Sequence, residues 1–105
     1  MVKEITVVEL KALLDSKPDV HLYDVRTEAE REICTIEGAI HLTQEVADTI
    51  DELPKETQLV FHCHHGGRSY QAAAYFGQRG FSDVVNVVGG IEAWALMVDP
   101  STPRY

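Results

Sequence analysis

A short apolar segment that runs directly into a glycine-rich turn constrains the fold of this chain more than any other feature. Residues 59–61 are Leu-Val-Phe, a run typical of a buried strand, and Ser69 opens a predicted helix that extends from Tyr70 to Arg79. Cys63 and two adjacent glycines lie in the turn between them. The sequence therefore predicts a cysteine at the end of a buried strand, followed by a tight turn and a helix.

Strands and helices alternate along the rest of the chain. The predicted strands are residues 20–25, 39–42, 59–61 and 84–88, and the predicted helices are a first one between Thr6 and Pro18, then 28–33, 43–53, 70–79 and 91–97. Because the strands are apolar on both faces, we expect an α/β fold with a parallel sheet flanked by helices on both faces. Such sheets bind ligands at the carboxyl ends of their strands, which is where Cys63 lies.

Length and composition bound the class of protein. The 105 residues are 45% hydrophobic, which is enough for one core, so we expect a single domain over residues 1–105. The net charge of −8 argues against nucleic acid or an anionic membrane surface as a partner, since both require a basic patch. No apolar run resembles a signal core or approaches the roughly 20 residues that cross a bilayer, so a cytoplasmic protein is expected. Disorder is expected only in the tail, residues 99–105.

Cys63 is the predicted nucleophile. Two cysteines without an export signal argue for a free thiol and against a disulfide scaffold. The glycine amides of the turn and the dipole of the following helix favour an anion here, and a thiolate is such an anion. Arg68 and two histidines add positive charge, so we expect a Cys63 pKa well below that of a free cysteine, on a sulfur that solvent can reach. The predicted substrate-binding residues are His64, His65, Gly66, Gly67, Arg68 and Ser69.

Three stretches of the chain resemble the signatures of one family, the single-domain rhodanese sulfurtransferases. Residues 24–27 with Glu30 are similar to its first signature, residues 63–69 to its active-site loop, and residues 80–94 to its closing signature. The resemblance implies a rhodanese-like α/β domain and a double displacement that uses no cofactor. In that reaction the Cys63 thiolate takes the outer sulfur of a donor such as thiosulfate, sulfite leaves, and cyanide or a thiol then takes the sulfur from the persulfide. The implied partners are a small anionic sulfur donor and a protein that donates or accepts sulfur.

Two other functions remain open at this level. A protein-coupled sulfur carrier, or a non-catalytic regulatory module, would use the same persulfide within a complex and would treat free thiosulfate as a poor substrate. A cysteine-dependent phosphatase or arsenate reductase shares the Cys and Arg pattern but has a longer loop, whereas four residues separate Cys63 from Arg68 here. A shorter loop closes a smaller ring of amides, which suits a single sulfur atom better than a phosphate. Because Arg68 is the one fixed cation of the loop, doubly charged thiosulfate is expected to bind weakly, and a persulfide is the alternative donor.

Other residues near the predicted site have two interpretations. Asp24 and Arg26, at the end of the neighbouring strand, either reach the loop and support the site or form an ion pair that fixes the strand ends. Cys34 is either a resolving thiol that forms a disulfide with Cys63 or a small residue that fills a glycine position of the family. Sequence alone leaves both pairs of alternatives open.

The histidines and the tryptophan carry simpler predictions. His62 is expected to pack within its strand, and the cluster of His62, His64 and His65 lacks paired ligands elsewhere, so no metal site is predicted. Trp94 is expected to close the edge of the core together with Phe81.

Overall fold

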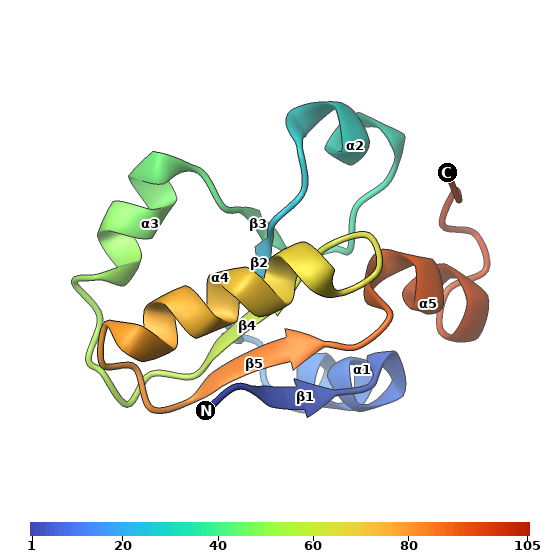
Figure 1. The fold of residues 1–105 in the computed structure, drawn as a ribbon. Helices are drawn as coiled ribbons and strands as arrows, with labels where there is room; N and C mark the ends of the chain where they lie inside the picture. Colours follow the sequence, from blue (N-terminus) through green and yellow to red (C-terminus); the bar gives the residue numbers. More distant parts are fainter.

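Five parallel strands form the centre of the molecule (Figure 1). The computed structural model describes residues 1–105. The strands are β1 (Lys3–Ile5), β2 (Leu22–Asp24), β3 (Ile40–His41), β4 (Leu59–His62) and β5 (Val84–Val87), and the helices are α1 (Val7–Ser16), α2 (Glu28–Ile33), α3 (Gln44–Ile50), α4 (Gly67–Gln78) and α5 (Gly90–Met97). The sheet order is β1-β5-β4-β2-β3, and every neighbouring pair is parallel. The strand that leads to Cys63, β4, is therefore central.

Helices cover both faces of the sheet, as the apolar strands predicted. One buried cluster joins α1 and α5 to the sheet and includes Leu10 and Val60. A second cluster joins α3 and α4 to the other face, where the rings of Phe61 and Phe76 stack with centroids 5.6 Å apart. Successive strand residues point to opposite faces, so the neighbours Val60 and Phe61 belong to different clusters. The predicted α/β fold is confirmed.

Local sequence signals set the helix ends. The Thr6 hydroxyl accepts a hydrogen bond from the Glu9 amide at 3.1 Å, and the Glu9 carboxylate accepts one from the Thr6 amide at 2.8 Å. This capping box starts α1. At the end of α4, Gly80 takes a φ of 106°, and the Phe81 amide donates back to the Phe76 carbonyl at 3.2 Å. This hydrogen bond and the left-handed Gly80 end the helix as the sequence predicted.

One strand was missed and one expectation about the core was wrong. The strand β1 was not predicted, because its three residues are too few for a pattern and its position is set by pairing with β5. Trp94 and Phe81 are both buried, but they lie in different clusters on opposite faces of the sheet, so they do not close one edge together. None of the helices combines the length and the apolar character required to cross a bilayer.

A buried ion pair fixes the carboxyl end of β2. Asp24 accepts hydrogen bonds from the Arg26 guanidinium at 2.9 and 2.8 Å and from Arg31 at 2.7 Å. Burial alone would raise the pKa of Asp24, but the hydrogen bonds and charge of Arg26, with His62, hold it below its ordinary value. Arg26 also donates to the Cys34 carbonyl at 2.6 Å, which ties the segment after α2 to the strand end. Asp24 and Arg26 were expected either to support the site or to form an ion pair that fixes the strand ends, and the structure shows the ion pair.

Acidification should destabilise this fold through His62. The imidazole is fully buried in β4, its Nε2 has no hydrogen-bond partner, and burial lowers its pKa to about 4. A histidine in the unfolded chain has a pKa of about 6.5. Between these values the unfolded chain binds more protons than the folded one, so stability falls as the pH falls. We expect a loss of up to about 3 kcal/mol in the free energy of unfolding between pH 7 and pH 4, measured by urea unfolding.

The control for this prediction is His62→Gln, which has no group that titrates in this window. The free energy of unfolding of the variant should depend less steeply on pH between 6.5 and 4 than that of the parent. Part of the slope should remain, because burial also lowers the pKa of His64. An unchanged slope in the variant would show that His62 is not the proton-linked group.

Candidate active site

Two carbonyl groups in the loop after β4 are bonded to the first turn of α5. The Cys63 carbonyl accepts a hydrogen bond from the Ile91 amide at 2.9 Å, and the His64 carbonyl accepts one from the Glu92 amide at 3.1 Å. The first amides of a helix have no partner within it, so these bonds satisfy both elements. In a trans peptide the N–H points opposite to the C=O, so the amide of His65 is turned away from α5.

The turn between β5 and α5 has to contain glycine for this contact. At Gly90, which has a φ of 57°, a Cβ atom would lie 2.4 Å from the Cys63 carbonyl oxygen and 2.5 Å from that of His64. No side chain fits in that space. The family resemblance included Gly90 in its closing signature, but no sequence pattern indicated that Gly90 contacts the cysteine loop.

A backbone amide holds the sulfur of Cys63. The Gly66 amide donates to Sγ at 3.1 Å, and the amides of His65 and Ser69 also lower the pKa of the thiol. Gly66 has a φ of 110° and precedes α4, which begins at Gly67, two residues before the expected start at Ser69. The positive end of the α4 dipole therefore lies at the sulfur, as predicted, and Arg68 belongs to the helix.

Ser69 is buried beside the sulfur, and its hydroxyl has two neighbours. It lies 2.5 Å from Asn86 Oδ1 and 3.4 Å from Cys63 Sγ. Asn86 is oriented by its other end, because its amide nitrogen donates to the Glu4 carboxylate at 3.0 Å. A hydroxyl has one proton, so the shorter contact assigns that proton to Asn86. The backbone amides, unlike the Ser69 hydroxyl, therefore donate to the sulfur without competition from Asn86.

These donors favour the thiolate form of Cys63. Burial by itself would raise the pKa of the thiol, but hydrogen bonds from Ser69, Gly66 and His65 together lower it below the ordinary value. The lowered pKa agrees with the prediction, although its causes are hydrogen bonds from Ser69 and the loop amides and not the cationic side chains. One expectation was wrong: Cys63 is only 1% exposed, so a reactant meets Sγ only after neighbouring groups move.

Arg68 does not point its charge at the sulfur. Its guanidinium donates to both oxygens of Glu30, at 2.7 and 3.0 Å. The hydrogen bonds from Arg68 are the main cause that holds the pKa of Glu30 far below its usual range, so the carboxylate is ionised at neutral pH. The fixed positive charge predicted for substrate binding is therefore paired with a negative one.

The two loop histidines form a stack with a residue from the tail. The rings of His64 and His65 lie 3.9 Å apart between centroids, and the ring of Tyr105 stacks on His64 at 3.9 Å and 10°. Burial, followed by the charge of His65, lowers the pKa of His64, and its Nε2 has no hydrogen-bond partner. The expected disorder of residues 99–105 is not found, since Thr102 is also buried.

The remaining candidates lie outside the loop. Both cysteines are free, and Cys34 is buried in the cluster beneath α1 and α5, with its sulfur 3.8 Å from the Arg26 guanidinium. This agrees with a small residue that packs in a glycine position. No three His, Cys, Asp or Glu side chains gather in a way that would hold a metal ion.

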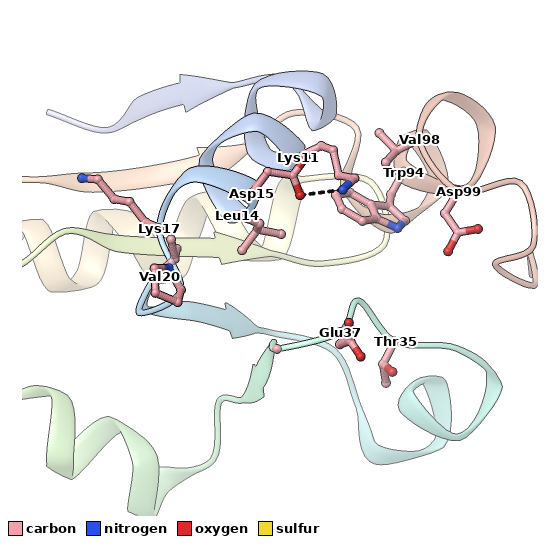
Figure 2. A pocket seen from close by; sticks show the side chains of 12 residues that line it. Lys11, Leu14, Asp15, Lys17, Val20, Thr35, Glu37, Trp94, Val98 and Asp99 are labelled. Carbon is pink, nitrogen blue, oxygen red and sulfur yellow. Dashed lines mark hydrogen bonds and ion pairs between the residues drawn. The ribbon is translucent and has the colours of Figure 1, made fainter.

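A cavity of about 700 Å³ opens elsewhere on the molecule (Figure 2). Its walls are α1, α5 and residues 35–38, and it is lined by side chains that include Leu14, Trp94 and Thr35. None of residues 63–69 lines it. The cavity is therefore separate from the Cys63 loop.

Sequence reasoning missed four residues that shape the site: Glu30, Asn86, Gly90 and Tyr105. Glu30 and Gly90 were noticed only as parts of family signatures. Asn86 interrupts an otherwise β-branched strand, which is a weak signal for a buried polar contact. Tyr105 had no signal, because nothing local to residue 105 indicates that it packs on residue 64.

Comparison with known proteins shows one family. The model of the rhodanese-like domain family matches residues 6–97. A sulfurtransferase from Allochromatium vinosum is 42% identical over 96 residues, which cover 90% of each chain. The thiosulfate sulfurtransferase GlpE of Pseudomonas aeruginosa is 42% identical over 80 residues, which cover 75% of this chain and 73% of that protein. A crystal structure of a rhodanese-like domain protein from Staphylococcus aureus matches with a TM-score of 0.75 at 33% identity, covering 88% of this chain and 90% of that one. Other matched relatives are longer, and this chain spans 26% of the length of two of them.

The contact between α5 and the loop can be tested by Gly90→Ala. The new Cβ should displace the carbonyls of Cys63 and His64, turn the loop amides and raise the pKa of the Cys63 thiol by about one unit or more. The measurement is the rate of iodoacetamide alkylation of Cys63 against pH, with the modified residue identified by mass spectrometry.

The matched control is Gly38→Ala. Gly38 also has a left-handed φ, of 90°, but a Cβ there meets nothing within 4 Å. Both variants should lose about 1–2 kcal/mol from backbone strain, and only Gly90→Ala should change the thiol pKa. Equal thiol pKa values in the two variants would contradict this account of the loop.

Proposed function

Since the chain belongs to the rhodanese-like domain family, we propose that it is a sulfurtransferase that carries sulfane sulfur as a persulfide on Cys63. The observation that supports this most directly is the Gly66 amide, which donates to the Cys63 sulfur at 3.1 Å in a loop whose Cys63 and His64 carbonyls are bonded to α5. Such a loop stabilises a negative charge on sulfur at neutral pH. The named relatives support sulfur transfer of the rhodanese type.

The first half of the reaction forms the persulfide. The Cys63 thiolate attacks the outer sulfur of thiosulfate, a new S–S bond forms, and the S–S bond of thiosulfate breaks so that sulfite leaves with the bonding electrons. In the second half, a thiolate or cyanide attacks the outer sulfur of the persulfide. The Cys63 thiolate is then regenerated, and the product is a new persulfide or thiocyanate.

The loop suits the charge that develops in this reaction. The negative charge moves from Sγ to the outer sulfur, and the amides of His65 and Gly66 with the α4 N-terminus provide donors for it. Amides do not titrate, so this stabilisation does not depend on the protonation of a side chain. His64, His65, Gly66, Gly67, Arg68 and Ser69 are proposed as the residues that contact the donor, and Asp24 and Arg26 as the pair that fixes the strand end beside them.

The position of Arg68 also bears on the phosphatase alternative. A phosphatase loop needs its arginine free to bind a phosphate dianion in the transition state. Here both guanidinium bonds go to Glu30, and the loop is short. These observations favour sulfur transfer.

The physiological donor and acceptor, small or protein-bound, and the cytoplasmic location stay predictions.

The central test is the site of sulfur loading. After incubation with thiosulfate, the protein should gain one sulfur atom on Cys63 and release one equivalent of sulfite, as measured by mass spectrometry and sulfite assay. Cys63→Ser should load no sulfur and should lose turnover by at least about 10³-fold, because no nucleophile remains.

The control is Cys34→Ala, which removes the other thiol and leaves the loop unchanged. This variant should still load sulfur on Cys63. Sulfur found on Cys34 in the parent protein, or turnover that survives in Cys63→Ser, would contradict the proposal.

A further inference from the structure

Tyr105 contacts the site from outside the segment that matches the family. The family model ends at residue 97, yet the Tyr105 hydroxyl donates to Glu30 at 2.6 Å and accepts from the Arg26 guanidinium at 3.1 Å. Its ring stacks on His64. Burial is the main cause that raises the pKa of Tyr105 to about 12, so the hydroxyl keeps its proton as a donor. Tyr105 therefore contacts His64 directly and Arg68 through Glu30, and both of these residues were expected to bind an anion.

The contacts of Tyr105 remove positive charge from the donor position. Glu30 neutralises Arg68, and Tyr105 fixes the carboxylate in that pairing. His64 is covered by the Tyr105 ring and, with its lowered pKa, is neutral at pH 7. A dianion that approaches Cys63 thus meets a paired guanidinium, a carboxylate and a neutral imidazole. A donor with less negative charge is repelled less by the Glu30 carboxylate.

We propose that Tyr105 is a specificity-determining residue that, through Glu30 and His64, makes the site select sulfane donors of low negative charge over doubly charged thiosulfate. This inference rests on the proposed function, since it concerns the donor of the same persulfide. The favoured class is an organic sulfane compound, in which the transferred sulfur is bonded to a carbon-bearing group in place of sulfite.

Two donors that undergo the same reaction differ by one unit of charge, and comparing each variant with the parent cancels their intrinsic difference in reactivity. Thiosulfate is a dianion and releases sulfite, whereas benzenethiosulfonate is a monoanion and releases benzenesulfinate. In both, the Cys63 thiolate bonds to the terminal sulfur, the donor S–S bond breaks, and the sulfinate or sulfite keeps the electron pair. Persulfide formed on Cys63 gives kcat/KM for each donor, and their ratio, thiosulfate over thiosulfonate, measures selection by charge.

Three variants separate the contacts of Tyr105. Glu30→Gln removes the carboxylate charge but keeps an oxygen for the Thr27 amide, which it caps at 3.0 Å. Tyr105→Phe removes the hydroxyl but keeps the ring on His64, and Tyr105→Ala removes both. The control is Tyr75→Phe, a tyrosine on α4 that is 52% exposed and contacts neither the loop nor Glu30. Thermal melts show which variants are folded.

The expected result is a change in the ratio. Glu30→Gln should raise it by about 5-fold, as expected for one uncompensated charge near the donor at high effective dielectric, with the effect in KM and not kcat. Tyr105→Phe should raise it by about 2-fold. Tyr105→Ala should also make thiosulfate turnover rise as the pH falls toward about 6.5, because an uncovered His64 regains its charge. Tyr75→Phe should leave the ratio unchanged.

Two results would overturn the inference while the proposed function stands. Equal acceleration of both donors in Tyr105→Ala would make Tyr105 a steric cover without selectivity. If Glu30→Gln and Tyr105→Phe form the persulfide with an unchanged ratio of kcat/KM values, then Tyr105 has no part in selecting the donor. A parent protein that forms no persulfide on Cys63 with either donor would instead refute the proposed function, and this inference with it.

Discussion

The site depends on two hydrogen bonds between the cysteine loop and α5. Ile91 and Glu92 donate to the carbonyls of Cys63 and His64, and these bonds hold the start of the loop so that the His65 amide is turned away from α5. The contact is possible because β5 lies next to β4 in the sheet, so the chain leaves β5 close to the point where it leaves β4. Gly90 completes it, since any side chain there would meet both carbonyls. Sheet order, a glycine and two helix amides together orient the loop.

Charge near the sulfur is balanced, although the chain as a whole has a net charge of −8. Arg68 pairs with Glu30 at the mouth of the loop, and Arg26 pairs with Asp24 beneath it. The sulfur anion is therefore stabilised by backbone dipoles in a region without a large net side-chain charge. Buried dipoles are screened little by salt, in contrast to exposed ion pairs. The thiolate should then be less sensitive to ionic strength than the choice of donor.

The fold was largely predictable because its signals are local. Capping by Thr6, the stop at Gly80 and the apolar strand before Cys63 each involve residues a few positions apart. Contacts between distant segments were not predictable. The chain has 17 acidic residues, and no local pattern indicates which of them pairs with Arg68. Residue types therefore predicted Cys63 in a turn between a buried strand and a helix, as the structure has it, but assigned to Arg68 and His64 a free charge that their distant neighbours remove.

Burial of Cys63 would have different consequences for the two halves of the proposed sulfur transfer. The donor would have to reach Sγ itself, which is enclosed by the loop, whereas the acceptor would have to reach a sulfur about 2 Å farther along the S–S bond of the proposed persulfide. Opening the loop would break hydrogen bonds, because the carbonyls of Cys63 and His64 are bonded to α5 and the Gly66 amide is bonded to the sulfur. Tyr105 is 40% exposed and is held by side-chain contacts alone. Movement at this residue disturbs neither the sheet nor the amide ring, so selection of the donor can vary while the chemistry of the sulfur is kept.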